Sequence, residues 1–126
     1  MKRSDLINKI IARKKQLNIT VDNFSKLSGV SVRTINRLLK NEDVKLSTVE
    51  DITNFLGLDF AGNEQLSLQE LQRKRAHEKA LFLASLVQST SALEMQGLEE
   101  DSLNNIILMY EKEFLSGAYK NTLWVA

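Results

Sequence analysis

The 126-residue chain has no cysteine, no proline and only five glycines, which excludes disulfides and thiolate metal sites and favours helix almost throughout. Its length allows one well-buried core, or two small helical units that share an interface. The net charge is +1, but residues 1–61 carry 11 Lys and Arg against 7 Asp and Glu and suit a nucleic-acid surface, whereas residues 62–126 carry 6 against 9 and are expected to face elsewhere.

A first helix is predicted from Ser4, as its N-terminal cap, to about Gln16. Arg13–Lys15 load its last turn with positive charge, where the helix dipole favours cations. Its apolar side is formed by Leu6, Ile7, Ile10, Ile11 and Leu17. The basic residues that are candidates to flank a phosphate backbone are Arg3, Lys9, Arg13 and Lys14.

Residues 19–41, ITVDNFSKLSGVSVRTINRLLKN, predict two helices joined by a tight turn. Thr20 can cap the first helix by accepting a hydrogen bond from a free amide of the first turn. Gly29 stands where the backbone must reverse, because glycine adopts a left-handed conformation without a Cβ clash. Ser31 caps the second helix, which is expected over 31–41. The apolar residues that face inward are Phe24, Leu27, Val30, Ile35, Leu38 and Leu39.

The outer face of helix 31–41 is polar and basic, which suits the major groove of DNA. Arg33 and Asn36 are the candidates for base edges, since Arg pairs with guanine and Asn with adenine. Arg37 and Lys40 lie further along and are expected at phosphates, although Arg37 has an alternative ion-pair partner in Glu42 or Asp43. The predicted DNA-contacting residues are Thr20, Val32, Arg33, Thr34, Asn36, Arg37 and Lys40.

This segment resembles the Cro/cI-type (XRE-like) helix-turn-helix family over roughly Leu6 to Leu58. The residues that carry the resemblance are Ile19-Thr20, Phe24-Ser25, Gly29-Val30-Ser31, Thr34-Ile35, Arg37-Leu38, Leu46-Ser47, Ile52 and Leu56-Gly57-Leu58. The resemblance implies DNA binding. Two departures matter: Val21 stands where the family usually has a phosphate-binding Gln, and Ser25 stands where it favours Ala.

A fourth helix is predicted to start at Ser47, which forms a capping box with Glu50, and to end at Gly57. Its buried residues are expected to be Val49, Ile52, Phe55 and Leu56. The following residues look like a linker rather than a fifth helix. The predicted organisation is a helix-turn-helix domain over 1–58, a linker over 59–66 and a helical dimerisation or partner-binding region over 67–126.

The second half opens with a capping box of Ser67 and Glu70. The helix that follows could reach Val87 or beyond, with an apolar face of Leu68, Leu71, Ala76, Ala80, Leu83, Ala84 and Val87. A further box at 91–94 would start a new helix after a break at 89–90, or would lie inside one longer helix; both interpretations remain open. Gly97 is expected to end this segment.

A last helix is predicted from Ser102 to Gly117. Trp124, in the tail after it, is too apolar to stay in water, so it should pack within its own chain, with a pocket in the second half as the expected place, or across a dimer, or into another protein. The predicted dimer or partner contacts are Leu103, Ile106, Ile107, Tyr110, Phe114 and Trp124, of which the first five follow helical spacing.

Charged residues outside the first half favour structural roles. His77 has no second ligand one helical turn away, so we interpret it as a surface residue and the run 73–79 as a solvated helix face. The acidic residues 99–101 would stabilise the N-terminus of the last helix. No catalytic triad, phosphate loop or metal motif occurs, so no enzyme activity, metal or cofactor is expected.

The sequence predicts an all-α, dimeric, sequence-specific DNA-binding regulator, and most simply a repressor, because a single recognition helix contacts too little DNA for useful specificity. One alternative is an antitoxin whose second half binds a toxin and which represses its own operon. Another is a protein-interaction adaptor without DNA binding. A cytoplasmic location is expected, because the charged start lacks a signal-peptide pattern and no apolar stretch is long enough to span a membrane.

Overall fold

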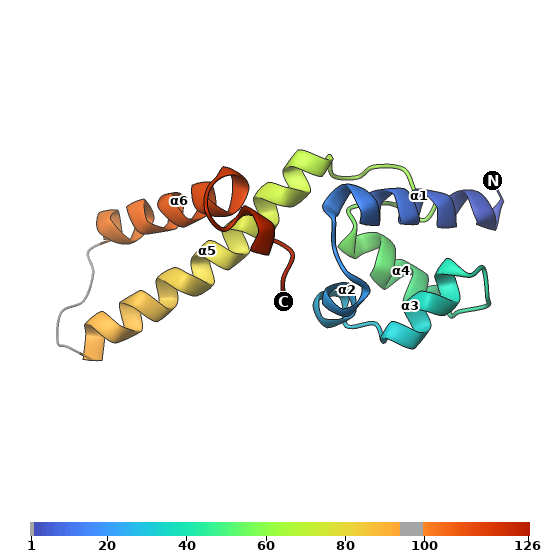
Figure 1. Ribbon diagram of the computed structural model, residues 1–126, viewed down its shortest axis with the longest axis horizontal. Coiled ribbons are helices and arrows are strands. Elements are labelled where there is room, and N and C mark those ends of the chain that lie inside the picture. The colour runs from blue at the N-terminus through green and yellow to red at the C-terminus, as the bar shows by residue number, and fades with distance from the viewer. Residues whose placement is uncertain (1, 94–99) are drawn as a thin grey trace. The chain divides into compact units, whose positions relative to one another are not determined.

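The computed structural model describes residues 2–93 and 100–126, and in these ranges the secondary structure is helical apart from one isolated bridge between Leu58 and Glu64 (Figure 1). The chain divides into two compact units. Unit 1 contains the residues up to Leu71 together with Trp124–Ala126, and unit 2 contains Gln72–Leu123. Within the described ranges, no helix is long and apolar enough to cross a membrane.

Unit 1 contains the first four helices and the start of the fifth. Their bounds are α1 Arg3–Leu17, α2 Val21–Ser28, α3 Val32–Leu39 and α4 Leu46–Phe55. Side chains from all four helices meet in one core, whose most deeply buried apolar members are Ile10, Phe24, Ile35, Leu38, Ile52 and Leu56. All six lie at positions where helical spacing predicts an inward side chain, so the predicted all-α fold is confirmed for this unit.

Two helices begin before their predicted caps. The first helix starts at Arg3 rather than after Ser4, and the Asp5 carboxylate accepts the backbone N–H of Lys2 at 3.1 Å. The fourth starts at Leu46 rather than after Ser47, because the carbonyl oxygen of Lys45 already accepts the N–H groups of residues 48 and 49 at 3.0 and 3.2 Å. The proposed capping box of Ser47 is therefore wrong.

The stretch expected to be a linker, 59–66, is an ordered loop in unit 1. Asp59 organises it: one carboxylate oxygen accepts the backbone N–H groups of Ala61 and Asn63 at 2.9 and 2.8 Å. These hydrogen bonds, that of Asn63 above all, hold the pKa of Asp59 below its usual value. The backbone N–H groups of residues 65 and 66 both donate to the carbonyl oxygen of Gly57, at 2.8 and 3.0 Å. The loop is thus tied both to itself and to the end of α4.

Arg13 joins this loop to α1 from a buried position. The residue is only 2% exposed, and its Nη2 donates to Glu64 Oε1 and to the carbonyl oxygen of Leu66, both at 3.0 Å. A side chain so buried cannot reach a phosphate backbone, so the interpretation of Arg13 as a flanking DNA contact is wrong. Its environment is made by a loop about fifty residues away in the sequence, which local patterns do not reveal.

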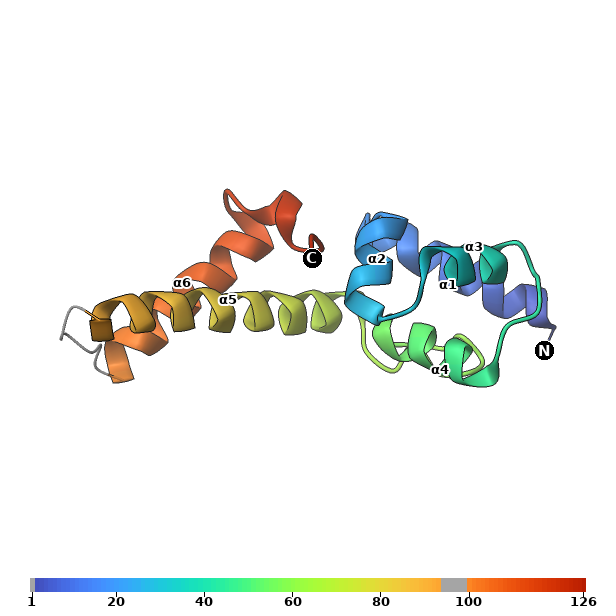
Figure 2. The ribbon, with the colours of Figure 1, turned by 90° about the horizontal axis from the view of Figure 1, so that it is seen from below.

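Unit 2 is built from α5 (Leu68–Leu93), whose first turn belongs to unit 1, and α6 (Glu100–Ser116), followed by a short 3₁₀ turn, η1 (Lys120–Thr122) (Figure 2). Helix α5 runs without a break through 89–90. Of the two interpretations left open by the sequence, one longer helix is therefore correct for residues up to 93. The predicted end at Gly97 and the Glu94 part of the third capping box lie outside the described residues. Helix α6 already includes Glu100, so Ser102 is not its cap.

Among the described residues, contacts of His77 and Lys79 join α5 to α6 inside unit 2. His77 Nδ1 lies 2.5 Å from Glu111 Oε1, so the lone histidine has a specific partner rather than only solvent. The ammonium of Lys79 lies 5.1 Å from the ring centroid of the buried Phe114, within the range of a cation–π interaction. The α5·α6 pair is therefore a packed helical hairpin.

The basic run 73–79 also holds the chain end of unit 2. Arg75 Nε donates to the carbonyl oxygen of Leu123 at 2.9 Å, and Lys79 Nζ donates to that of Thr122. Burial lowers the pKa of both side chains, and for Lys79 the neighbouring positive charge of Arg75 adds to the effect. For these two residues the interpretation as a solvated face is wrong, because the carbonyl oxygens of Leu123 and Thr122 accept their hydrogen bonds.

The last three residues of the chain return to unit 1. The ring of Trp124, 8% exposed, packs edge-to-face on Phe55 of α4 with centroids 5.9 Å apart, and Phe55 lies 5.3 Å from Phe24 of α2. The backbone N–H of Ala126 donates to Asn23 Oδ1 at 3.1 Å. Of the locations expected for Trp124, packing within its own chain is confirmed, but the ring lies in unit 1 and not in a pocket of the second half: it completes an aromatic cluster with helices α2 and α4.

Candidate nucleic-acid interface

Helices α2 and α3 are joined by a turn whose conformation follows from its sequence. Thr20 accepts the backbone N–H of Asn23 at 3.2 Å and starts α2. Gly29 ends α2 with a φ of +78°, a left-handed conformation that side-chain-bearing residues rarely adopt. Val30 then turns inward and is 8% exposed. The result is the two-helix arrangement of α2 and α3 seen in Figure 1.

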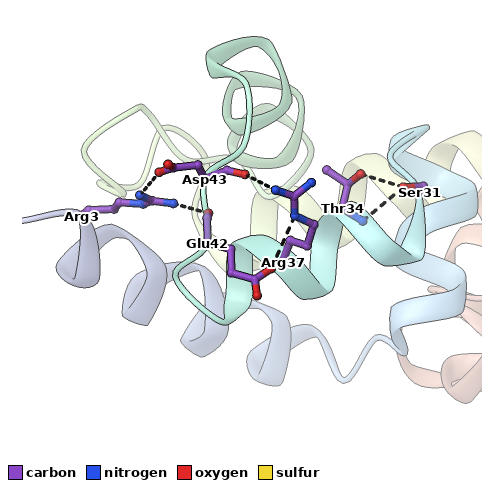
Figure 3. A network of polar contacts seen from close by, with 6 residues as sticks. All are labelled: Arg3, Ser31, Thr34, Arg37, Glu42 and Asp43. Carbon is purple, nitrogen blue, oxygen red and sulfur yellow. Dashed lines mark hydrogen bonds and ion pairs between the residues drawn. The ribbon is translucent and has the colours of Figure 1, made fainter.

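The start of α3 is fixed by two hydroxyl groups. Ser31 Oγ accepts the backbone N–H of Thr34 at 3.2 Å and lies 2.8 Å from Thr34 Oγ1 (Figure 3). Both predicted caps, Thr20 and Ser31, are confirmed by these hydrogen bonds. The Thr34 hydroxyl is therefore engaged with the cap, while its half-buried side chain remains at the edge of the outer face.

Helix α3 separates an apolar inner side from a basic outer side. Ile35 and Leu38 are 1% and 2% exposed. The exposed side chains of the outer face are Val32, Arg33, Asn36, Arg37 and Lys40. The structure thus brings together on α3 and its C-cap, Lys40, all the predicted contacts except Thr20, which lies exposed at the start of α2.

Arg37 is held by the turn that follows α3. Its Nε lies 3.4 Å from Glu42 Oε2, and its Nη2 donates to the carbonyl oxygen of Asp43 at 3.1 Å (Figure 3). Both side chains of this ion pair are about half exposed. The alternative partner expected for Arg37 is therefore in place, while its guanidinium remains accessible from solvent.

Arg3, from the start of α1, meets the same turn. Its Nη1 lies 2.6 Å from Asp43 Oδ1, and its Nη2 donates to the carbonyl oxygen of Glu42 (Figure 3). Lys9, another candidate to flank DNA, donates instead to the carbonyl oxygen of Ala61 and to Asn63 Oδ1, each at 3.3 Å. The turn 42–43 and the loop 59–66 therefore engage basic side chains of α1.

An apolar pocket that the sequence did not predict lies beside this corner of unit 1. Its volume is about 370 Å³, and Leu46 and Phe60 on its lining are 78% and 51% exposed. The rest of the lining is Arg3, Leu6, Ile7, Leu38, Asp43, Val44 and Val49. The available signal was Phe60 itself, a large aromatic residue in a polar stretch without helical periodicity.

The predicted dimer or partner residues are not gathered at one place. Leu103, Ile106, Ile107 and Tyr110 are half-buried on α6, and Phe114 is buried beneath Lys79. Trp124 lies in unit 1. Among the described residues of unit 2, the large apolar side chains that are exposed are Leu81, Phe82, Leu86, Leu108, Met109 and Tyr119. None of these six had been predicted as a contact.

Comparison with known proteins places the first half of the chain. The sequence model of the helix-turn-helix family matches residues 10–63. Residues 10–63 are a helix-turn-helix domain of the Cro/cI (XRE-like) type. No curated protein and no solved structure matches the chain.

The helix-turn-helix domain spans α1 from Ile10 onward, α2, α3, α4 and part of the loop 59–66. Helix α3 is the second helix of the helix-turn-helix motif and carries the basic outer face. The family indicates DNA binding and a role in the regulation of transcription. The remainder of the chain, including α5 and α6, is not covered by the match.

Proposed function

We propose that the protein is a sequence-specific transcriptional regulator that reads the major groove of DNA with α3. The observation that carries this proposal is the exposed outer face of α3, which places Arg33, Asn36 and Lys40 on one side of a helix whose other side is buried. A helix with this distribution can enter the major groove while its apolar side stays in the domain core.

The proposed division of labour follows the position of each side chain on α3. Arg33 and Asn36 lie in its first turns and are assigned to base edges, where they can discriminate guanine and adenine. Lys40 and Arg37, nearer the end of the helix, are assigned to phosphates. Val21, in place of the usual phosphate-binding Gln, removes one contact and lowers affinity without changing the docking.

The experiment that tests this function has two steps. Fragments of genomic DNA that bind the full chain are selected and sequenced, and the enriched site is then titrated at several salt concentrations. The proposal expects one enriched, near-palindromic motif and binding that weakens with salt. If no fragment is enriched and no DNA is shifted in a gel, the alternative function of a protein-interaction adaptor without DNA binding would be favoured.

We further propose that the protein binds its site as a homodimer through unit 2. A two-helix hairpin of this size buries too little apolar surface to be stable alone, and its inner positions on α5 are mostly small alanines. Phe82 and Leu108 are 63% and 61% exposed on the two helices. A second copy would cover such side chains and would present two recognition helices about 34 Å apart to successive major grooves.

Sedimentation of the full chain at tens of micromolar tests this assembly. We expect a dimer, and we expect Phe82→Glu to shift it toward monomer while Lys74→Glu, an exposed position on the same helix, does not. A monomeric wild-type chain would refute the homodimer. It would favour the antitoxin alternative, in which a toxin covers this surface, and a short toxin gene should then lie beside the gene of this protein.

A further inference from the structure

The turn after α3 carries two carboxylates that hold two arginines. Arg37 contacts Glu42, and Arg3 contacts Asp43 (Figure 3). We propose that this acidic turn, Glu42–Asp43, competes with DNA phosphate for both arginines and thereby weakens sequence-independent binding. The inference rests on the proposed function, because it takes α3 as the DNA-reading helix.

The backbone fixes the turn beside α3. Asn41 has a φ of +62°, and its N–H donates to the carbonyl oxygen of Leu38 at 2.9 Å. The next N–H, that of Glu42, donates to the carbonyl oxygen of Arg37, also at 2.9 Å. Asparagine is one of the few residues that adopt this conformation readily. This hydrogen-bonded turn therefore places Glu42 beside Arg37.

The turn neutralises the charge of its surroundings. Two arginines and two carboxylates give this corner a net charge of zero, although it lies next to the basic outer face of α3. Sequence-independent affinity depends on how many phosphates the protein neutralises, because each one releases condensed counterions. An arginine that is paired with a carboxylate adds no net charge to this count.

The competition is reversible because both ion pairs are accessible. The Arg37 and Glu42 side chains are 48% and 54% exposed, and Asp43 is 96% exposed. Exposed ion pairs are weak, so a phosphate can displace the carboxylate, but only against its repulsion. Arg33 and Asn36 have no side-chain hydrogen bond or ion pair to any described residue. Contacts to bases are therefore left unhindered while contacts to phosphates are penalised.

Glu42→Gln in the full chain tests the proposal. The selected site and random DNA of equal length are titrated at several salt concentrations. We expect random DNA to bind about three- to fivefold more tightly at low salt. The salt dependence should steepen by roughly one unit, since one more phosphate is neutralised. The selected site should tighten by a similar factor, because a phosphate contact carries no sequence information. Asp43→Asn is expected to act in the same direction through Arg3.

The matched control is Glu70→Gln, which removes the same charge from an exposed position in the first turn of α5. It should change neither the salt dependence nor the affinity for random DNA. In an Arg37→Gln background, Glu42→Gln should lose most of its effect, because the cation for which it competes is absent. Melting temperatures of all variants show that each one is folded.

Three results would overturn the inference. One is an unchanged salt dependence for Glu42→Gln. Another is weaker binding, which would mean that Glu42 positions Arg37 for DNA. The third is an equal gain for Glu70→Gln, which would reduce the effect to net charge. If the wild-type chain binds no DNA at all, the proposed function fails together with this inference, whereas the three results above leave the function intact.

Discussion

At the scale of residues, three arginines of unit 1 with the same charge have different environments. Arg33 projects from α3 into solvent, Arg37 is shared with a carboxylate, and Arg13 is buried under the loop 59–66. The difference arises from the hydrogen-bond acceptors and carboxylates that lie close to each guanidinium. Because Arg33 has no partner among the described residues and Arg13 has two, substitutions at these positions should affect different properties.

At α3 we predict that base and phosphate contacts separate. Arg33→Ala should cost about 1–3 kcal/mol on the selected site and relax its preference at one base position. Lys40→Ala should weaken binding to all sequences about equally and lower the salt slope by roughly one unit. Titrations with single-base variants of the site check both, with Lys74→Ala as control. Unchanged affinity of both variants would refute the docking of α3.

At Arg13 we predict that removing the carboxylate of its partner, Glu64, destabilises the fold more than removing the arginine itself. Glu64→Gln leaves the buried guanidinium without a carboxylate and should lower the free energy of unfolding by about 1–3 kcal/mol. Arg13→Met should cost less, because it also removes Nη1, which is buried without a hydrogen-bond acceptor among the described residues. Urea unfolding measures both. The reverse order of stability would contradict this account.

At the scale of elements, helices begin where backbone geometry permits rather than at the best capping residue. Ser31 and Ser67 act as caps, whereas Ser47, in an equally good motif, does not. The extended conformation of Lys45 starts α4 earlier, at the end of a turn that contacts α1 and α3. A connecting segment can likewise be structured without any helix, as the loop 59–66 shows.

For this loop we predict a pH dependence that originates at Asp59. Hydrogen bonds from the loop backbone lower the pKa of Asp59 in the folded state. The ionised carboxylate therefore stabilises the fold at pH values above the usual Asp pKa of about 3.9. That contribution is lost as the pH falls through the lowered pKa. Asp59→Asn should therefore be less stable than wild type at pH 6, and the difference should shrink at pH 3.

The urea midpoints of the two proteins at both pH values provide the measurement. Asp51→Asn, at an exposed position on α4, is the control and should leave the pH dependence unchanged. An Asp59→Asn variant whose deficit persists undiminished at pH 3 would show that the carboxylate charge is not responsible.

At the scale of the whole molecule, both ends of the chain belong to unit 1. Trp124 packs on α4, and Ala126 is hydrogen-bonded to Asn23 of α2. Because the sequence predicts a domain over 1–58 followed by a linker, a fragment ending at residue 62 would be expected to fold alone. It would lack both the tail and Glu64, the partner of Arg13, so unit 1 as the structure has it is not contained in that fragment.

We predict that Trp124→Ala destabilises the protein by about 3–5 kcal/mol, the usual cost of emptying a buried aromatic site. Trp124→Phe should cost far less, because the ring stays and an indole N–H without a hydrogen-bond partner among the described residues is removed. The emission of this only tryptophan should be blue-shifted in the native chain. Emission at the fully exposed wavelength, or an unchanged free energy of unfolding for Trp124→Ala, would refute the docked tail.

The sequence by itself determined the elements of the helix-turn-helix domain, since each depends on residues close together in the chain. Thr20, Gly29 and Ser31 set the turn between α2 and α3, and spacing set the buried side of α3. Only the tertiary structure decided the roles of Arg13, of the loop 59–66 and of Trp124. The partners of Arg13 and Trp124 lie more than 50 residues away in the chain, and Lys9 and Arg13 of α1 contact the loop from 51 to 54 residues away. Burial and charge pairing at such distances depend on packing, which local periodicity does not encode.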